Sequence, residues 1–458
     1  MWNSVDPILK ERLYGLTGPQ VNHGEDVKEC YYYLDSTSTH SYMKALYPQR
    51  EFPYGQLRNE NSGRDRMQPE FELSDAGAFE EDRYFDVVSE YAKGSPNDIL
   101  IRVHVSDSAT IHVLPTLWFR NTWTWNCEHE GCWPKPAMWV ESDAAITASH
   151  ATLGKFTFSA DVGGNGSTQW LFTDNVSNLN RLYGTENPTP YCKDAFNDFV
   201  IRGESAAVNS KNVGTKVTPY VVLELTSGET RTLQFRLSAD GEASETAFGP
   251  GFDQVFEQRI SEADSFYEER TPATLNADER NVLRQSDAEL LWTKQFYHLV
   301  VEDWLRGDPE HPAPESRKTV RNHDWPTSHN RDVISMPDKW ECPWYAAWDL
   351  AFHMIPFARL DLDFAKEQLV LFLREWYMHP NGQIPAYEWN FSDINPPVHA
   401  WACWQIYEMT KEAGQPDRVF QKLLINFTWW VNRKDVSGKN IFTGGFLGLD
   451  NIGGFVSK

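Results

Sequence analysis

A carboxylate within an apolar segment is the first sign of chemistry in this sequence. Asp349 follows Trp348 in PWYAAWDLAFHMIPFARL, which is almost entirely apolar and is predicted to form a buried helix. A carboxylate in such a helix needs a partner charge or a polar cavity, because burial without hydrogen bonds is costly. Carboxylates accept hydrogen bonds from sugar hydroxyls, and indole rings stack on sugar faces. Trp348 and Asp349 are therefore candidate sugar-binding residues.

Three polar residues near this helix allow more than one interpretation. Arg331 and Asp332, in NRDVISMPDKWE, form either a structural ion pair or part of a cavity mouth with Trp348 and Asp349. We keep both as candidate substrate-binding residues. His353 lies one turn after Asp349, and a histidine at such a position is more often a core residue with satisfied hydrogen bonds than a ligand.

The second candidate stretch is the loop NGQIPAYEWNFSDINPP. It carries Gln383, Tyr387, Glu388 and Trp389. Polar loops are usually only solvated, but a solvated loop rarely places Tyr and Trp on either side of Glu. We therefore predict that these four residues belong to a binding loop.

The candidates lie in the second half of a chain whose halves differ in pattern. Up to about residue 245, segments rich in β-branched and aromatic residues are bounded by Gly, Asn, Asp and Ser. Examples are ILIRVHVSDSATIHV, GKFTFSADV, TPYVVLELTSG and TRTLQFRLSAD. Many short strands in one block predict a β-sandwich over residues 1–245 rather than alternating strands and helices.

Helical patterns dominate from residue 246 onward. Residues 246–275 include FDQVFEQRISEADSFYEER and are predicted to form a helical linker. Asn276 is a good N-cap, and the run NADERNVLRQSDAELLWTKQFYHLVVEDWL predicts one long helix. Further helices are predicted over PWYAAWDLAFHMIPFARL, DFAKEQLVLFLREWYM, PPVHAWACWQIYEMTKEAG and PDRVFQKLLINFTWWVNR.

The expected fold class is a mainly β N-terminal half followed by an all-α C-terminal half. Helices in series over residues 276–458 are typical of the first part of an α/α toroid, which needs roughly a dozen helices to close its core. A small helical bundle that is complete as it stands is the alternative. Composition alone does not separate the two.

The composition excludes several classes of partner. The 458 residues include 65 acidic and 42 basic side chains, a formal net charge of −23. Such a surface repels phosphate backbones, so neither nucleic acid nor an anionic membrane is an expected partner. No apolar stretch has the length of a membrane span, and the first residues lack the pattern of a secretory signal. We expect a cytoplasmic protein, and the sequence leaves its oligomeric state open.

Cysteine spacing and the common catalytic motifs indicate neither metal nor cofactor. Of six cysteines, only Cys127 and Cys132 are close together, with His129 between them. A metal site would need further ligands at zinc-like spacing, and none is visible, so we favour two free thiols in a reducing compartment. The motifs GxGxxG after a strand, GxxxxGK[ST], HExxH and GxSxG are also missing.

Long stretches of the chain resemble a known enzyme family. These are NRDVISMPDKWECPWYAAWDLAFH, LREWYMHPNGQIPAYEWNFSDINPPVHAWA, LLINFTWWVNRKD, GGFLGLDNIG and, near the N-terminus, DPILKERLYGLTGPQVNHGEDVKECYYYLDSTSTHSYMK. They resemble glycoside hydrolase family 63, in particular its bacterial glucosidase-like branch, related to mannosylglycerate and glucosylglycerate hydrolases and to processing α-glucosidase I. The resemblance implies a β-sandwich followed by an (α/α)6 toroid. It also implies inverting hydrolysis of α-glycosides without metal or cofactor.

The resemblance also suggests roles for single residues. Asp450 in GLDNIG aligns with the family's general acid, and a glycine-rich apolar setting favours the protonated carboxyl. From the residues alone, Asp450 could instead cap a turn. Family members extend beyond both ends of this sequence, which implies a partial chain that lacks the second catalytic carboxylate and is weakly active alone. The residues that match segments lining the family's sugar subsite are Trp348, Asp349, Gln383, Tyr387, Glu388 and Trp389.

Two other functions remain open at this point. If the catalytic base is absent, the chain could be a carbohydrate-binding or interaction protein without turnover. A toroidal phosphorylase, in which phosphate replaces the base, is the third possibility. Binding without turnover, or release of a sugar phosphate, would distinguish them.

Overall fold

The chain folds into two compact units, which are described separately. The computed structural model describes residues 1–9, 30–65, 67–80, 83–163, 168–242, 246–319, 322–336, 344–387, 394–411 and 415–442. The first unit comprises residues 1–64 and 69–269, and the second comprises residues 65–68 and 270–458. In the described part of the chain, no helix is both long and apolar enough to span a membrane.

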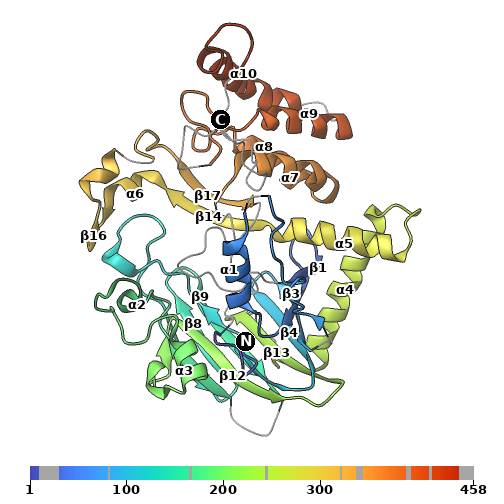
Figure 1. Ribbon diagram of the computed structural model, residues 1–458, viewed down its shortest axis with the longest axis vertical. Helices are drawn as coiled ribbons and strands as arrows, with labels where there is room; N and C mark the ends of the chain where they lie inside the picture. The colour runs from blue at the N-terminus through green and yellow to red at the C-terminus, as the bar shows by residue number, and fades with distance from the viewer. Residues whose placement is uncertain are drawn as a thin grey trace. The chain divides into compact units, whose positions relative to one another are not determined.

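Two antiparallel sheets form most of the first unit (Figure 1). The larger sheet contains, in spatial order, β1 (Tyr32–Ser36), β2 (Tyr42–Gln49), β3 (Phe85–Ser95), β4 (Asp98–Asp107), β13 (Glu229–Ala239), β9 (Gly154–Asp161), β8 (Ala145–His150), β7 (Ala137–Ser142) and β11 (Val213–Gly214). The smaller sheet contains β10 (Gln169–Thr173), β12 (Lys216–Glu224) and β5 (Thr110–Val113), and β6 (Leu117–Trp118) pairs with β12.

The two sheets share one apolar core. Phe158 on β9 and Phe235 on β13 come from the larger sheet, and Phe172 on β10 and Val217 on β12 come from the smaller one. All four are buried, and the rings of Phe158 and Phe235 stack with their centroids 6.0 Å apart. Alternating side chains that point to one face explain why each sheet contributes to the core. The predicted antiparallel β region in the N-terminal half is thus confirmed.

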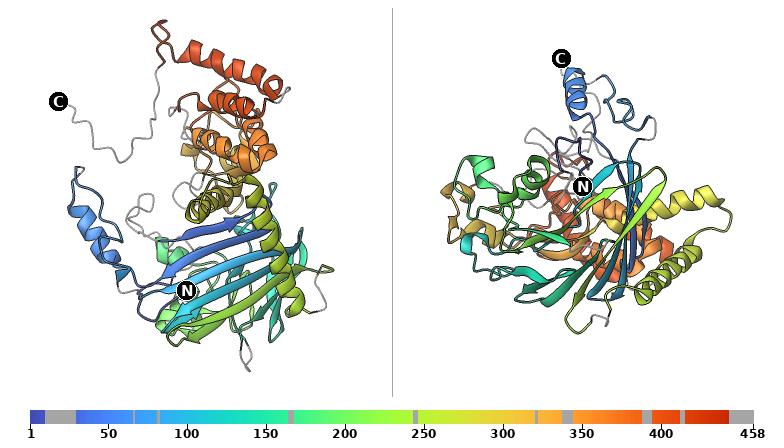
Figure 2. Two further views of the ribbon diagram at one scale, coloured as in Figure 1. Left: turned by 90° about the vertical axis from the view of Figure 1, so that its right-hand side faces the viewer. Right: turned by 90° about the horizontal axis from the view of Figure 1, so that it is seen from below.

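The described residues of the first unit form four α-helices. They are α1 (Tyr54–Gly63), α2 (Leu179–Tyr183), α3 (Ala195–Arg202) and α4 (Pro250–Arg270). Figure 2 shows α4 lying along the larger sheet, where Phe252 and Phe256 pack with Tyr42, Ala92 and Leu100. The segment predicted as a helical linker therefore forms a helix that packs on the sheet.

Helices and two strand pairs form the described part of the second unit. The helices are α5 (Ala277–Trp292), α6 (Val301–Arg306), α7 (Ala347–Leu360), α8 (Leu362–Leu371), α9 (Val398–Thr410) and α10 (Gln415–Arg433). The strands are β14 (Lys294–Val300) and β17 (His329–Ser335), with the short pair β15 (Gly307–Asp308) and β16 (His311–Pro312). A helical C-terminal region was predicted and is confirmed, although the strand pairs show that it is not all α. The first part of an incomplete (α/α)6 toroid stays a prediction.

The prediction of one long helix after Asn276 is wrong. Asn276 does cap the start of α5 through a capping box. The Asn276 side chain accepts a hydrogen bond from the N–H of Glu279, and the Glu279 carboxylate accepts one from the N–H of Asn276. The helix ends at Trp292, and the following KQFYHLV forms β14, paired antiparallel with β17. Aromatic and β-branched residues favour a strand once a partner strand is available.

The helix predicted over DFAKEQLVLFLREWYM also ends earlier than expected. α8 stops at Leu371, and residues 372–378 form turns. The carbonyl of Trp376 accepts a hydrogen bond from the N–H of His329, the first residue of β17, at 3.3 Å. Trp376 is thus bonded through its backbone to β17 instead of continuing α8, and the helical pattern of the sequence did not predict this contact.

Candidate functional site

The first turn of α7 holds Trp348 and Asp349. Asp349 is half-buried, and burial raises the pKa of its carboxyl above the ordinary value of 3.8. Hydrogen bonds from its own backbone and from the Trp348 side chain act in the opposite direction but are the smaller effects. A carboxylate in the first turn of a helix also interacts favourably with the exposed N–H groups there. Asp349 is therefore a carboxyl group in a drier environment than bulk water.

A backbone hydrogen bond connects α7 to the predicted binding loop. The N–H of Ala347 donates to the carbonyl of Ala386 at 2.9 Å. Trp348 follows Ala347, and Tyr387 follows Ala386, so the two stretches that the sequence singled out lie side by side here. Tyr387 is half-buried. We refer to this place, defined by Ala347–Asp349 and Gln383–Tyr387, as the α7–loop junction.

The loop is held in a tight turn before it reaches α7. The N–H of Gly382 donates to the carbonyl of His379 at 2.8 Å, and the N–H of His379 donates to the carbonyl of Gln383 at 2.9 Å. Gly382 has a φ of +95°, and an added Cβ would lie 3.0 Å from atoms of Ile425 on α10. The Asn426 side chain donates to the Gly382 carbonyl at 2.8 Å. Gln383 is buried within this turn.

Arg331 and Asp332 do not act as a pair. They are consecutive in β17, opposite His298 and Tyr297 of β14, so their side chains leave opposite faces of the strand. Arg331 is exposed and Asp332 is half-buried. The Asp332 carboxylate accepts a hydrogen bond from the Tyr377 hydroxyl at 3.2 Å. Burial raises the pKa of Tyr377, and the Asp332 charge acts in the same direction, so Tyr377 is a hydrogen-bond donor at neutral pH.

Asp332 lines a cavity of about 490 Å³ beside β17 and α8. Glu367, Arg374 and Trp376 supply a second carboxylate, a guanidinium and an indole, and Val370 and Leu371 supply apolar wall. Trp376 is 39% exposed. Glu367 also forms an ion pair with Arg418 of α10 at 3.0 Å. The size and the mixture of ring and carboxylate fit a small polar ligand.

Within the described residues, the candidate site residues thus lie at two places, the α7–loop junction and the cavity beside β17 and α8. The described lining of the cavity includes Asp332 but not Trp348 or Asp349. Sequence reasoning missed Glu367, Arg374 and Trp376, because they were part of a predicted continuous helix. Trp376 carried the only signal, as a tryptophan close to the loop that starts at His379.

His353 is a core histidine, as predicted. Its Nδ1 is hydrogen-bonded to the Ser335 hydroxyl at 2.8 Å, and that hydroxyl is 2.7 Å from the Thr293 hydroxyl. Burial lowers the pKa of His353 to about 4. The neutral ring therefore connects α7 to the end of β17 and carries no charge at neutral pH.

Three predicted site residues lie outside the described residues. They are Glu388, Trp389 and Asp450. Their assignments remain those of the sequence analysis.

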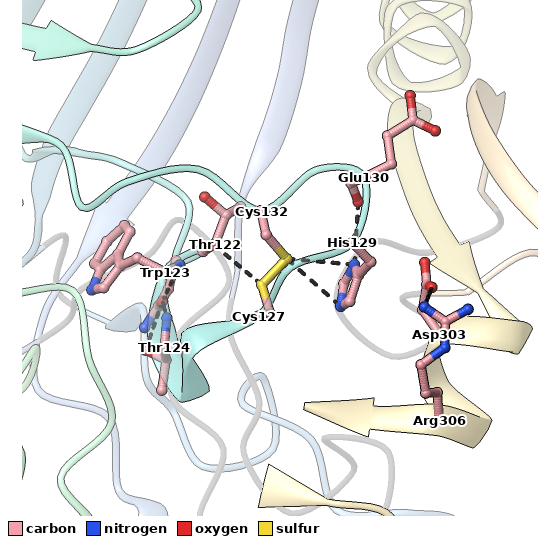
Figure 3. Close-up of a disulfide and its surroundings, with 10 residues drawn as sticks. Thr122, Trp123, Thr124, Cys127, His129, Glu130, Cys132, Asp303 and Arg306 are labelled. Carbon is pink, nitrogen blue, oxygen red and sulfur yellow. Dashed lines mark hydrogen bonds and ion pairs between the residues drawn. A yellow bond between two sulfur atoms is a disulfide. The ribbon is translucent and has the colours of Figure 1, made fainter. Parts of the chain in front are cut away.

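Cys127 and Cys132 form a disulfide in the structure, so the prediction of two free thiols is wrong (Figure 3). Their Cα atoms are 5.8 Å apart, a separation that suits a disulfide. The reducing compartment inferred from free thiols loses that support. Together with His129 these cysteines form a group of potential metal ligands in the described part of the chain.

Part of the second unit is similar to a known glycoside hydrolase domain. Residues 342–445 match the model of the mannosylglycerate hydrolase MGH1-like glycoside hydrolase domain. That range includes the α7–loop junction and Glu367, Arg374 and Trp376 of the cavity. The match shows that these residues are similar to a glycoside hydrolase domain.

Two further comparisons extend over most of the chain. A Saccharomyces cerevisiae (strain ATCC 204508 / S288c) protein, described as uncharacterized protein YMR196W, is 44% identical over 507 residues, which is 99% of this chain and 46% of that protein. The chain thus spans about half the length of this curated relative. A solved structure described as a kojibiose phosphorylase from the human microbiome covers 76% of this chain and 43% of its own, with 7% identity and a TM-score of 0.28. A superposition this loose supports no argument about fold or activity.

Proposed function

We propose that the chain is a glycoside hydrolase acting on α-glucosides, either oligosaccharides or glucosylglycerate-like compounds, by an inverting two-carboxylate mechanism. The observation that carries the proposal is the domain match over residues 342–445, a range that includes the backbone hydrogen bond between Ala347 and Ala386. The name of the matched domain, mannosylglycerate hydrolase, supports a glycoside with a small acidic aglycone as one substrate class.

The α7–loop junction would bind the sugar. Trp348 offers an indole face for a pyranose ring, and Asp349 accepts hydrogen bonds from hydroxyls. Burial raises the pKa of Asp349, which favours the protonated, donating form of its carboxyl relative to an exposed aspartate. Gln383, Tyr387, Glu388 and Trp389 are assigned to the same subsite by the sequence resemblance.

Asp450 is proposed as the general acid. In an inverting glycosidase one protonated carboxyl protonates the leaving oxygen, and a second carboxylate activates water from the opposite face of the sugar, with the two carboxyl groups about 6.5–9.5 Å apart. A glycine-rich apolar surrounding favours the protonated form of Asp450.

The assignment of Asp450 is tested by the dependence of its variant on the leaving group. Asp450→Asn keeps the shape and removes the transferable proton, and general acid catalysis commonly contributes about 10²–10⁴-fold. We expect a loss of that size on α-glucosides with alcohol leaving groups and a much smaller loss on α-glucosyl fluoride. Asn451→Ala is the matched neighbouring control. Equal losses on both substrates would remove Asp450 from the acid role.

Sugar binding is tested separately, because it does not require turnover. Titration of glucose or a short α-glucoside is expected to change tryptophan fluorescence, and Trp348→Ala is expected to remove much of that change. Trp404→Ala on α9, exposed by 56%, serves as the control. If Trp376→Ala removes the signal and Trp348→Ala does not, the sugar binds in the cavity beside β17. Saturable binding with no hydrolysis of any glucoside would favour the non-catalytic alternative.

A further inference from the structure

The loop between β6 and β7 brings two sulfur atoms and one imidazole ring together. One ligand-type atom from each of Cys127, His129 and Cys132 lies within 4.8 Å of the others, and all three residues are half-buried. Figure 3 shows the His129 ring facing the disulfide, whereas the Glu130 carboxylate points away from it. This group belongs to the first unit and takes no part in the proposed hydrolysis.

The loop has a frame that does not depend on the disulfide. The Asn121 side chain accepts from the N–H of Thr124 at 3.2 Å and donates to the carbonyl of Asn175 at 3.1 Å. The carbonyl of Thr122 accepts from the N–H of Trp133 at 3.3 Å, which closes the loop just outside the two cysteines. Breaking the sulfur–sulfur bond therefore leaves both cysteines held near each other.

A β-turn places His129 beside Cys132. The N–H of Cys132 donates to the carbonyl of His129 at 3.1 Å, so residues 129–132 form a four-residue turn. Gly131, at the third position of that turn, has a φ of +91°, the conformation that a type II turn requires and that glycine adopts without strain. The spacing of the histidine and the cysteine is thus built into the backbone.

The hydrogen bond of Nδ1 leaves Nε2 of His129 as the nitrogen that can ligate a metal ion. Nδ1 of His129 lies 3.3 Å from the carbonyl oxygen of Glu130 and can donate its hydrogen to it. Ligating histidines commonly donate their other ring N–H to such an acceptor. Sγ of Cys132 lies 3.4 Å from Nδ1 and 3.6 Å from Nε2. In a tetrahedral zinc site, with Zn–S of about 2.3 Å and Zn–N of about 2.0 Å, the sulfur and nitrogen ligands are about 3.5 Å apart, so the ring is at ligand distance from this sulfur.

We propose that reduction of the Cys127–Cys132 disulfide turns this loop into a binding site for a soft divalent cation of the zinc class. The ligands are the thiolates of Cys127 and Cys132 and Nε2 of His129, with water in the fourth position of a tetrahedral site. Thiolates select such cations over hard ones such as Mg²⁺ or Ca²⁺. The disulfide and the metal-bound site cannot exist together, because the two sulfur atoms bind the cation as thiolates and a disulfide sulfur carries no such charge.

The exchange balances with small-molecule thiols as the reductant. Two thiols form a disulfide between themselves and release two electrons and two protons. The electrons break the bond between Cys127 and Cys132, and the protons give two cysteine thiols. Binding of the cation then releases those two protons, so the affinity for the cation increases with pH.

Cobalt(II) titration of the whole chain tests the proposal. The chain is reduced with a phosphine, which is removed before Co²⁺ is added. We expect one Co²⁺ per chain with thiolate-to-cobalt charge-transfer absorption, displaced by Zn²⁺. The unreduced chain should show no such absorption. Zn²⁺ should also protect Cys127 and Cys132 of the reduced chain from alkylation, as read by peptide mass.

Variants separate this loop from the other thiols of the chain. His129→Ala keeps both cysteines, so the disulfide can still form, but should weaken Co²⁺ binding by more than about tenfold. Cys127→Ser should abolish the charge-transfer absorption, and Cys30→Ser, which changes a half-buried thiol elsewhere, should leave it intact. Absence of Co²⁺ binding by the reduced chain would overturn the proposal. Unchanged absorption in Cys127→Ser would do the same.

Discussion

Two carboxyl groups, one in each unit, have pKa values shifted in opposite directions, although burial raises the pKa of both. Glu90 in the first unit is buried, yet its pKa is lowered to about 2. Burial alone raises that pKa, but hydrogen bonds from His104 and Tyr42 and the charge of Arg102 outweigh it. Asp349 in the second unit is less buried, and burial nevertheless dominates and raises its pKa. The difference lies in the partners, because the fold of the first unit supplies donors for its carboxylate.

Apolar side chains follow the same division. The large apolar residues of the two sheets meet in one shared core. In the second unit, exposed apolar residues gather on successive helices, namely Phe352 on α7, Trp401 and Trp404 on α9, and Phe420, Leu424, Phe427 and Val431 on α10. The spacing on α10 follows the helical repeat and makes one stripe. The shared core of the first unit thus contrasts with an exposed apolar stripe on α10 of the second, which is suited to a ligand or a partner.

The largest expected effect on stability tests the contrast between the shared core of the first unit and the exposed apolar stripe on α10. Phe235→Ala removes a fully buried ring from the shared core and should lower the free energy of unfolding by about 3–5 kcal/mol. Phe420→Ala on α10, exposed by 64%, should change it by less than about 0.5 kcal/mol. Denaturant unfolding of both variants measures the difference. Similar losses for the two would break the comparison.

The next effect concerns Glu90. Glu90→Gln removes the charge that His104 and Arg102 face at 2.8 Å and 3.4 Å, and should lower the unfolding free energy at neutral pH by about 1.5–3 kcal/mol. Because the folded pKa is below the ordinary value of 4.5, this stabilisation is present above that value and is lost as the pH falls through about 2.

Denaturant unfolding of the wild-type chain and of Glu90→Gln, at several pH values between about 7 and 2, measures this effect. The gap between the wild-type chain and Glu90→Gln should narrow as the pH falls from about 4.5 towards 2. Glu257→Gln, at an exposed position on α4, is the control and should show a small gap at every pH. A gap that stays constant with pH would mean that Glu90 acts through packing rather than charge.

Asp349 should give a smaller effect of opposite sign. Its raised pKa means that the folded state favours the protonated form, so its contribution to stability is complete at low pH and is lost as the pH rises through the folded pKa. Asp349→Asn should therefore stabilise the chain at neutral pH, by about 0.5–2 kcal/mol, while weakening sugar binding. Thermal melts at two pH values and the fluorescence titration check both parts. A variant that is less stable at neutral pH would show that Asp349 has a structural role.

The smallest effect on stability is expected for the α10 stripe. Leu424→Gln with Phe427→Gln changes residues exposed by 50% and 58%, and should alter the unfolding free energy by less than about 0.5 kcal/mol. Exposed apolar patches drive association, so the variant should contain more monomer than the wild-type chain at equal concentration. Sedimentation velocity measures this. A wild-type chain that is fully monomeric at high concentration would contradict the expectation.

The sequence predicted features that depend on neighbouring residues and missed those that depend on distant ones. The start of α5 was predicted because its cap needs only Asn276 and Glu279. Its end was not, because residues 294–300 become a strand only beside residues 329–335. The position of Trp376 depends in the same way on a hydrogen bond to His329.

The candidate site shows the same limit. Trp348, Asp349, Gln383 and Tyr387 were found as residue types in suggestive order, and the structure adds the hydrogen bond that brings their segments together. Glu367 and Arg374 carried no sequence signal, since charged residues on a predicted helix are usually solvated. The disulfide was missed because the spacing of two cysteines does not reveal their oxidation state.

The bond between Ala347 and Ala386 uses main-chain atoms only. This hydrogen bond therefore does not depend on which side chains stand at positions 348 and 387. A chain with other residues at these two positions can keep the same backbone link, so the ligand preference of the junction can change while the two segments stay joined.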